Sequence, residues 1–362
     1  MKNTFGQSVS LTLFGESHGA EIGAILDGIA PGIAVDEDFI RHQLSLRRPA
    51  GKLSTSRVES DPFRIVSGVF EGKTTGTPIA ILISNSNTKS YDYTPEIPRP
   101  GHADFAAECK YHGFQDYRGG GHFSGRVTAA LVAAGAILIS ALRQKGIEIG
   151  THIDRVGKIK DRSFGDLKAD FSILENKNIP VLDERIEAEM KAFIECAAAE
   201  GDSVGGVLET VVTGVEAGVG EPWFDTVESL LSHALFGIPA IKGVEFGDGF
   251  AMAEMRGSQA NDAFRVEDEK IVTATNHNGG INGGITNGMP IVFRCAVKPT
   301  PSIFKEQQTV DLYRKENLDF SLQGRHDPAI IHRARVVVDS VTALVLCDLL
   351  AQRHGTDWLK GK

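Results

Sequence analysis

The sequence predicts a mixed α/β protein in which some of the long helices form an internal layer. Three observations support this fold class. Short runs of branched or alternating apolar residues, which are typical of strands, recur along the chain. Longer segments with apolar residues every three or four positions, which are typical of helices, separate these runs. Two of the helices carry apolar or small residues on most of their surface, so they require a layer above and a layer below.

Seven segments are expected to form strands. Their apolar residues either alternate with polar ones, as on a half-buried strand, or form a short continuous run, as on a fully buried one. The segments are Ser8 to Phe14, Ile22 to Ile29, Phe63 to Phe70, Ile79 to Ser84, Val207 to Val215, Ile241 to Phe246 and Ile291 to Val297.

Four longer segments are expected to form helices. The first, 36–46, opens with an acidic cap at Asp36 and ends before Pro49. The second, 124–144, is crowded with alanines around Gly135, and such small residues let neighbouring elements approach closely. The third and fourth are 184–200 and 335–353. Because no Pro- or Ser-rich linker interrupts the chain, we expect a single domain over residues 1–362.

The composition excludes several classes of protein. The chain has 362 residues, a formal charge of −9 and 40 glycines, where average usage of about 7% would give roughly 25. The glycines have no three-residue period, which excludes collagen, and aliphatic residues are too plentiful for a disordered chain. A sequence pI near 5.7 argues against a nucleic-acid partner, since affinity for phosphate backbones comes mainly from lysine and arginine.

The cysteines and the absence of long apolar runs indicate a cytoplasmic protein. Cys109, Cys196, Cys295 and Cys347 are far apart and form no C-x-x-C pair, so we expect reduced thiols and no metal site. The N-terminus lacks the apolar run that export requires. No apolar stretch approaches the roughly 18 residues of a membrane span, so no membrane partner is expected.

Glycine clusters with histidine and arginine in four segments. Glycine lets backbone N–H groups approach an anion, arginine binds phosphate or carboxylate with a planar fork, and histidine can donate a proton near neutral pH. Each segment alone is typical of an ordinary turn, but together they indicate an anion-binding pocket. They are Gly15 to Gly19, Arg118 to Arg126, Asn276 to Gly284 and Gly324 to Pro328.

A basic stretch and several histidines lie outside these four segments. The basic stretch 41–57 is either a solvated helix end followed by a loop, or a binding loop that begins at Arg47-Arg48-Pro49. Outside the glycine clusters, four histidines are interpreted as surface or packing residues: His42, His152, His233 and His354. The common nucleotide, dinucleotide, zinc and serine-hydrolase motifs are all absent.

In their order along the chain, these motifs resemble the chorismate synthase family. The resemblance spans nearly the whole chain. Its strongest segments are Gly15-Glu16-Ser17-His18-Gly19, Arg99-Pro100-Gly101-His102-Ala103-Asp104, Ser124-Gly125-Arg126-Val127-Thr128, Lys298-Pro299-Thr300-Pro301-Ser302 and Arg325-His326-Asp327-Pro328. The resemblance implies a β-α-β sandwich with long helices between two mainly antiparallel sheets.

The resemblance also implies a reaction. 5-Enolpyruvylshikimate 3-phosphate would lose phosphate from C3 and hydrogen from C6 in a 1,4-anti elimination, giving chorismate at the last common step of the shikimate pathway. The reaction needs reduced FMN although it involves no net redox change. Two carboxylates and a phosphate on the substrate, with a second phosphate on FMN, match a locally cationic pocket.

Roles for individual residues follow from the same resemblance. His18 would protonate the departing phosphate, and His102 would protonate the reduced flavin or hold its charge. Asp327 would assist removal of the proton from the flavin. The residues expected to bind the substrate are Ser17, Arg47, Arg48, Lys52, Arg99, Arg126 and Arg325. Those expected to bind FMN are His122, Phe123, Ser124, Pro239, Ala240, Gly283, Lys298, Pro299, Thr300, Pro301, Ser302 and Arg325.

Several points stay open at this level. The chain has His122-Phe123 where many family members have Arg-Ser, and Pro239 where asparagine is common, so individual flavin contacts differ from the family pattern. The family forms homotetramers, and its members either reduce their own flavin with NADPH or depend on a separate flavin reductase. The alternatives to the enzyme are a flavin- or anion-binding homologue without catalysis and a phosphatase of unusual fold.

Overall fold

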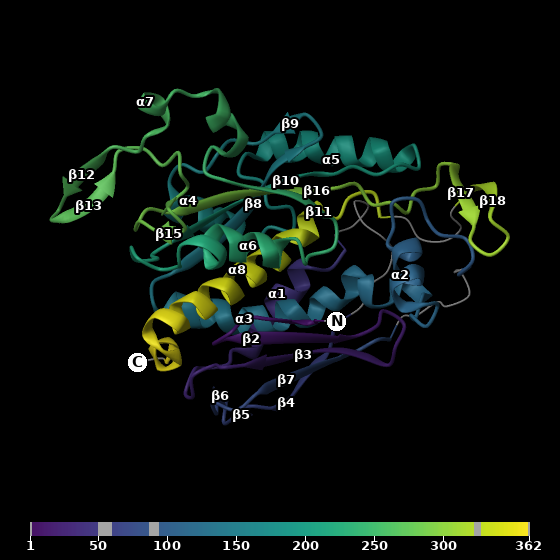
Figure 1. The fold of residues 1–362 in the computed structure, drawn as a ribbon, viewed down its shortest axis with the longest axis horizontal. Helices are drawn as coiled ribbons and strands as arrows, with labels where there is room; N and C mark the ends of the chain where they lie inside the picture. The colour runs from purple at the N-terminus through teal and green to yellow at the C-terminus, as the bar shows by residue number, and fades with distance from the viewer. Residues whose placement is uncertain (1, 50–59, 87–93, 322–326, 361–362) are drawn as a thin grey trace.

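Two antiparallel sheets enclose a layer of long helices in the computed structural model (Figure 1). The structure describes residues 2–49, 60–86, 94–321 and 327–360. This arrangement confirms the internal helices that the residue pattern predicted and the β-α-β sandwich that the resemblance implied.

The first sheet contains five strands from the N-terminal part of the chain. Its edge-to-edge order is β1-β2-β3-β7-β4, and every neighbouring pair is antiparallel. In β7, the buried residues Ile79, Ile81 and Ile83 alternate with half-buried ones, so one face of the sheet packs on the helices. The strands are β1 (Thr4–Phe5), β2 (Ser10–Gly15), β3 (Glu21–Asp27), β4 (Phe63–Ser67) and β7 (Ile79–Ser84).

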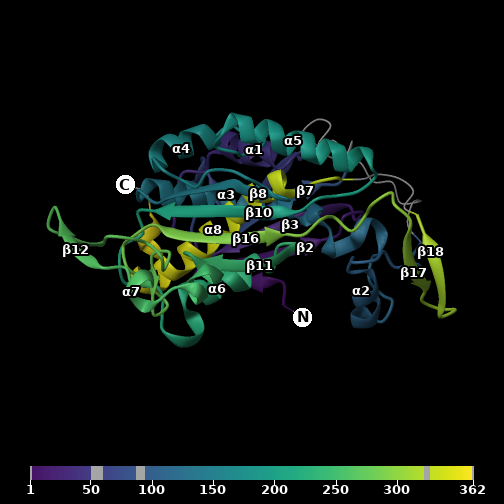
Figure 2. The same cartoon turned by 90° about the horizontal axis from the view of Figure 1, so that it is seen from above.

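The second sheet also has five antiparallel strands, in the order β11-β16-β10-β8-β9. Figure 2 shows its longer strands side by side. In β16, the buried residues Ile291, Phe293, Cys295 and Val297 alternate with half-buried ones. The strands are β8 (Glu148–Val156), β9 (Ile159–Lys160), β10 (Gly206–Thr213), β11 (Ile241–Phe246) and β16 (Ile291–Val297).

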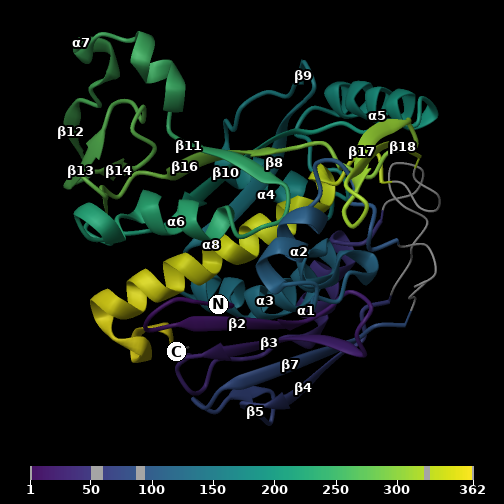
Figure 3. The same ribbon diagram turned by 45° about the vertical axis from the view of Figure 1, so that its right-hand side comes forward.

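Three helices fill the space between the sheets: α1 (Glu37–Leu46), α3 (Thr128–Gln144) and α8 (Ile331–His354). Figure 3 shows α8 crossing the molecule above α3 and the first sheet. The helices α3 and α8 cross at Gly135, where an added Cβ would lie 2.3 Å from the Cβ of Ser340. The segment Gly125–Gln144 is long and apolar enough to cross a membrane. However, 89% of its most apolar stretch is buried inside the protein, as expected for a core helix.

The remaining elements lie around this sandwich. The helices α4 and α5 pack beside β8 and β9, whereas α2 and the β17–β18 hairpin lie at the opposite end of the molecule from the β12–β13 hairpin (Figures 1 and 2). The helices are α2 (Asp104–Tyr111), α4 (Leu167–Leu174), α5 (Glu184–Ala199), α6 (Val227–Leu235) and α7 (Gly257–Ala260). The hairpins pair β5 (Val69–Phe70) with β6 (Lys73–Thr74), β12 (Phe264–Glu267) with β13 (Lys270–Thr273), β14 (Ile281–Asn282) with β15 (Ile285–Thr286), and β17 (Gln307–Asp311) with β18 (Glu316–Phe320). The 3₁₀ turns are η3 (Arg118–Phe123), η4 (Gly125–Val127), η5 (Trp223–Asp225), η6 (Gly249–Glu254) and η7 (Thr356–Leu359).

The structure corrects three of the expected element bounds. The strand expected over 63–70 is two strands, because Gly68 interrupts it with a φ of +82°. The helix expected from residue 124 begins as the 3₁₀ turn η4 and becomes α-helical at Thr128. The last helix begins at Ile331 rather than 335, one turn earlier than the apolar pattern indicated.

Candidate active site

A cavity of about 1040 Å³ lies between the start of the chain, the start of α3 and the helix α8. One side is apolar, with Leu11 and Leu13 from β2 and Val341 and Leu344 from α8. The other side is polar and is built from loops. Cavities with apolar walls and a few convergent polar groups are the usual form of small-molecule sites.

The charges around the cavity are strongly unbalanced. Among the residues that the structure describes, the acidic ones that line it are Asp61 and Asp327. Its lysine and arginine lining residues are Lys2, Arg47, Arg48, Arg99, Arg126, Lys242, Lys298 and Arg333. A chain of net charge −9 therefore concentrates positive charge at one place, which suits an anionic ligand.

Two histidines reach this cavity against one glycine-rich loop. His18 lies in the turn after β2, and His102 lies just before α2. A Cβ on Gly119 would lie 2.5 Å from the His18 ring, and one on Gly120 would lie 3.3 Å from the His102 ring. Both glycines have positive φ values, 62° and 81°, which side chains rarely adopt. Consecutive glycines thus place the two histidines at neighbouring positions of the wall.

Ser17 and Arg48 each present a buried polar atom toward this region. Within the described part of the chain, the Ser17 Oγ and the Arg48 Nε have no hydrogen-bond partner. The Ser17 side chain does not line the cavity itself but lies next to His18, about 3.0 Å from where a Gly119 Cβ would be. Buried polar groups are normally paired, so these atoms fit a site that accepts an anionic ligand.

Arg47 and Arg126 form a buried cluster with Asp61, which the sequence analysis did not single out. Both guanidinium groups pair with the Asp61 carboxylate, at 3.7 Å in the case of Arg47. Arg47 also donates to the Thr128 hydroxyl (3.0 Å), and Arg126 donates to the Asn85 side chain (2.9 Å). The two arginines are therefore held rigidly at the cavity wall by the start of α3 and the end of β7.

Asp327 is paired with Arg333, another residue that the sequence analysis missed. The Arg333 Nη1 lies 2.6 Å from Asp327 Oδ2, while its Nε donates to the Arg47 carbonyl (2.9 Å). The Asp327 carbonyl accepts a hydrogen bond from the Thr300 hydroxyl (2.5 Å). Arg333 thus links the first turn of α8 to the loops that carry Asp327 and Arg47.

Most of the residues expected to bind FMN line the same cavity. They are His122, Phe123, Ser124, Pro239, Ala240, Lys298, Thr300, Pro301 and Ser302. His122 bonds the Gly15 carbonyl through Nδ1 (2.8 Å), and the Phe123 ring packs edge-on against Tyr111. The backbone N–H of Lys298 donates to the Ala240 carbonyl (2.9 Å), which joins two of the expected flavin segments.

The structure does not bring every expected residue to the cavity. Pro299 packs near Gly205 and does not line it. Gly283 lies in the turn between β14 and β15, and the loop 276–284 contributes no lining residue because Asp262 and Asp248 bind it elsewhere. Lys52 and Arg325 are outside the described residues.

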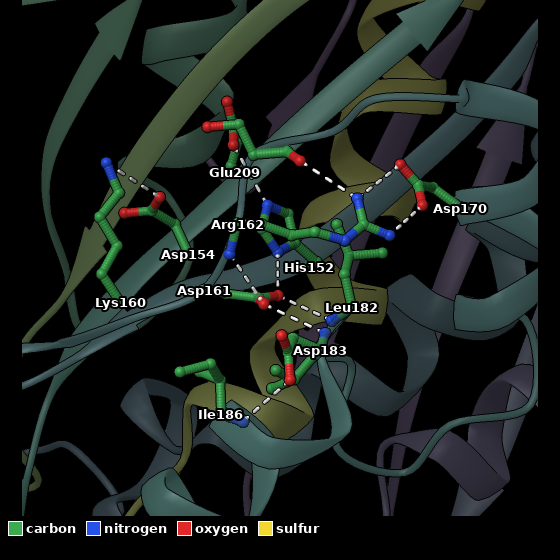
Figure 4. Close-up of polar contacts among 12 residues, drawn as sticks. His152, Asp154, Lys160, Asp161, Arg162, Asp170, Leu182, Asp183, Ile186 and Glu209 are labelled. Atoms are coloured by element: carbon green, nitrogen blue, oxygen red, sulfur yellow. Dashed lines mark hydrogen bonds and ion pairs between the residues drawn. The ribbon is translucent and has the colours of Figure 1, made fainter.

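The histidines outside the glycine clusters are placed as follows. His42 and His354 contact protein groups near the surface, as predicted, but His233 packs on Phe5 and borders the cavity. His152 is fully buried between Asp161 (3.0 Å) and Glu209 (3.1 Å), as Figure 4 shows. Burial alone would lower its pKa, but the two carboxylates outweigh burial and raise it. This group contributes no lining residue, so it is structural.

The sequence of the chain matches a known protein family over most of its length. The model of the family described as chorismate synthase matches residues 9–351. The chain belongs to the chorismate synthase family. Proteins named chorismate synthase are 45% identical in Thermococcus kodakarensis and 47% identical in Pyrococcus abyssi, each over 96% of this chain and 98% of the relative. The protein of the same name from Chitinophaga pinensis is 47% identical over 97% of this chain and 98% of its own.

The fold agrees with that membership. A crystal structure of chorismate synthase superposes with a TM-score of 0.76 at 29% identity, covering 97% of this chain and 94% of the other. As a chorismate synthase family member, the chain is a lyase of the shikimate pathway that eliminates phosphate from 5-enolpyruvylshikimate 3-phosphate to form chorismate. The resemblance given by its motifs is therefore confirmed.

Proposed function

We propose that the cationic cavity binds 5-enolpyruvylshikimate 3-phosphate together with reduced FMN and that the elimination takes place there. The observation that carries this proposal is the pairing of His18 and His102 against consecutive glycines of one loop, in a wall of fixed arginines. The volume of about 1040 Å³ is large for one small ligand and suits two.

The donor set fits both anions. Arg47 and Arg126 are held by Asp61, so they present fixed positive charge at little further cost in side-chain entropy. Arg48 lines the cavity, and its Nε, which has no partner among the described residues, would donate to carboxylate or phosphate oxygens, while the Ser17 hydroxyl lies behind the wall beside His18. On the flavin side, Lys298 and the hydroxyls of Thr300 and Ser302 line the wall. When bound, reduced FMN would lend an electron as the C3–O bond breaks and would recover it with the hydrogen that leaves C6, so that the reaction has no net redox change.

The protein's own residues would handle the protons. His18 would donate a proton to the phosphate oxygen as the C3–O bond breaks, because a neutralised phosphate leaves more readily. His102 would hold a proton beside the flavin ring, and Asp327 would receive one, with Arg333 keeping its carboxylate directed. The apolar wall of Leu11, Leu13 and Val341 would exclude water, which strengthens these electrostatic interactions.

An anaerobic assay tests this function. The purified chain is mixed with chemically reduced FMN and the substrate in dim light, and phosphate release, chorismate and the flavin spectrum are followed. Release of phosphate with chorismate supports the proposal. Flavin binding without phosphate release would indicate a binding protein, and phosphate release without flavin would indicate a phosphatase. A parallel arm with oxidised FMN and NADPH shows whether the chain reduces its own flavin or needs a separate reductase.

We also infer a homotetramer that works in the cytoplasm. The homotetramer comes from the resemblance of the chain to its family, and the cytoplasmic location comes from its scattered cysteines and its lack of a long apolar run. Light scattering on the purified protein, giving a mass four times that of the 38.9 kDa chain, would support the assembly, and a monomeric mass would contradict it.

A further inference from the structure

Asp104, the first residue of α2, touches two cavity residues at once without lining the large cavity itself. Its Oδ1 accepts a hydrogen bond from His102 Nδ1 at 2.6 Å. Its Oδ2 accepts from the Arg99 backbone N–H at 3.0 Å and from Arg99 Nε at 2.8 Å. Arg99 Nη2 also donates to Oδ1, at 2.9 Å. One carboxylate thus holds a histidine and an arginine of the cavity wall.

We propose that Asp104 is a positioning residue of this site, which fixes His102 in the tautomer that carries its proton on Nδ1 and fixes the direction of the Arg99 guanidinium. The proposal rests on the proposed function of the cavity. Because a neutral imidazole has one donor nitrogen and one acceptor nitrogen, a carboxylate on Nδ1 leaves Nε2 as the acceptor. Arg99 Nη2 lies 3.1 Å from Nδ1 and 3.3 Å from Nε2, so it does not distinguish the two nitrogens, and the assignment rests on the carboxylate 2.6 Å from Nδ1.

The surroundings of the pair support this role. Burial alone would raise the pKa of Asp104, but hydrogen bonds from Arg99 and His102 outweigh it and lower the pKa, so the carboxylate stays ionised at neutral pH. On the other side of the ring, Gly120 leaves room for Nε2, since a Cβ there would lie 3.4 Å away. Lys298 is also close to this group, because its ammonium group donates to the carbonyl of Gly101, the residue before His102, at 2.5 Å.

A different role for Asp104 would be purely structural. An acidic residue in the first turn of a helix is stabilising in itself, because it faces the positive end of the helix dipole. The experiment must therefore separate an effect that passes through His102 from an effect on α2. A double-mutant cycle does this, because it measures whether two residues act together.

The experiment measures kcat and KM with reduced FMN for Asp104→Asn, His102→Ala and the double variant. Asp104→Asn keeps the size of the side chain and removes its charge, and we expect kcat to fall by about 10- to 100-fold, as for other residues that orient a functional histidine. In the His102→Ala background, the same change should alter kcat by less than about 3-fold, since the ring it orients is gone. Equal losses in both backgrounds, or no loss in the wild-type background, would overturn the proposal.

A matched control lies one turn along the same helix. Glu108 bonds Gln115 (2.8 Å) and is not part of the cavity wall, so Glu108→Gln should leave kcat unchanged. A second readout does not depend on turnover: ¹⁵N NMR of the histidine rings, with His102→Gln used for assignment. We expect the wild type to show His102 protonated on Nδ1 and Asp104→Asn to show a mixture of tautomers. If the wild type lacks activity, the proposed function fails, whereas an Nε2-protonated ring in the wild type contradicts the role of Asp104.

Discussion

Among the histidines that line the cavity, His18 and His102 are the ones on which turnover should depend most. His18 and His102 each contact a glycine of the η3 loop, and each is placed to exchange a proton with a ligand. General acid–base groups typically contribute about 10²–10⁴-fold, so His18→Ala and His102→Ala should each lower kcat by that factor. The control is His42→Ala, because His42 is remote from the cavity and bonds the Glu175 carbonyl. Unchanged turnover in both cavity variants would refute their assignment.

The buried His152 should make stability depend on pH. Its pKa is raised in the folded protein by Asp161 and Glu209, so the native state holds a proton that the unfolded chain releases near pH 6.5. The stabilisation is therefore complete below about pH 6.5 and is lost as the pH rises through the raised pKa. Urea unfolding should show the free energy of unfolding falling across this window in the wild type, and less steeply in His152→Gln. Identical slopes for the two proteins would contradict this interpretation.

At the residue scale, sequence reasoning found the groups that belong to short motifs and missed their partners. His18, His102 and Asp327 stand in motifs whose residue types already indicate proton transfer. Asp61 and Arg333 do not belong to any short motif whose residue types indicate proton transfer or anion binding. Asp61 pairs with Arg126, 65 positions further along the sequence, and a pairing over this distance leaves no local pattern. Asp104 belongs to the motif Arg99 to Asp104, and its place two residues after His102 was the one sequence feature that could have indicated a contact between them.

Among the elements, the crossing of α3 and α8 is the tightest point of the helical layer. A methyl group at Gly135 would come within 2.3 Å of the Ser340 Cβ and 2.8 Å of its Cα, so the helices would have to separate. We expect Gly135→Ala to lower the free energy of unfolding by about 1–3 kcal/mol, as overpacking does, although alanine favours helix formation. Urea denaturation measures it. The control is Gly165→Ala, where a Cβ meets nothing within 4 Å, and a Gly135→Ala variant as stable as this control would contradict the crossing geometry.

Sequence patterns predicted the long elements better than the short ones. The helices α1, α3, α5 and α8 have enough turns for their apolar residues to repeat, and the acidic cap at Asp36 marked where α1 begins. By contrast, α2 and α4 have eight residues each, too few for a clear period. The interruption at Gly68 follows from close packing, because a side chain there would collide with Ile79 and Pro78. Such a contact between strands is invisible to local periodicity.

For the whole molecule, the net charge is negative while the cavity is positively charged, and this difference should make substrate binding depend on salt concentration. The chain is acidic overall, yet its cavity is lined mainly by arginine and lysine among its charged residues. Raising the salt concentration from about 0.1 M to about 1 M shortens the Debye length from about 10 Å to about 3 Å. We expect the KM for the substrate to rise across this range while kcat changes much less. Arg41→Gln, which alters an exposed charge paired to Glu37, should show the same dependence. A KM that does not change with salt would contradict a role for this field.

The architecture of the whole molecule was predicted in part from residues and in part from resemblance. The alanine-rich segment around Gly135 indicated a helix between two layers, which the structure confirms. The antiparallel character of both sheets came only from the resemblance, and their strand order was not predicted, because pairing between distant strands leaves no local signal. The single domain over 1–362 stays a prediction. The anion pocket was predicted from four glycine clusters, but the loop 276–284 does not line it, because composition does not say where a loop folds.

The central claim is that one cavity holds the substrate and reduced FMN between the η3 loop and α8. A crystal structure of the chain with FMN and 5-enolpyruvylshikimate 3-phosphate tests it most directly. The account predicts both ligands in this cavity, with the substrate phosphate near His18 and the flavin ring near His102 and residues 298–302. Either ligand bound elsewhere on the protein, with this cavity empty, would contradict it.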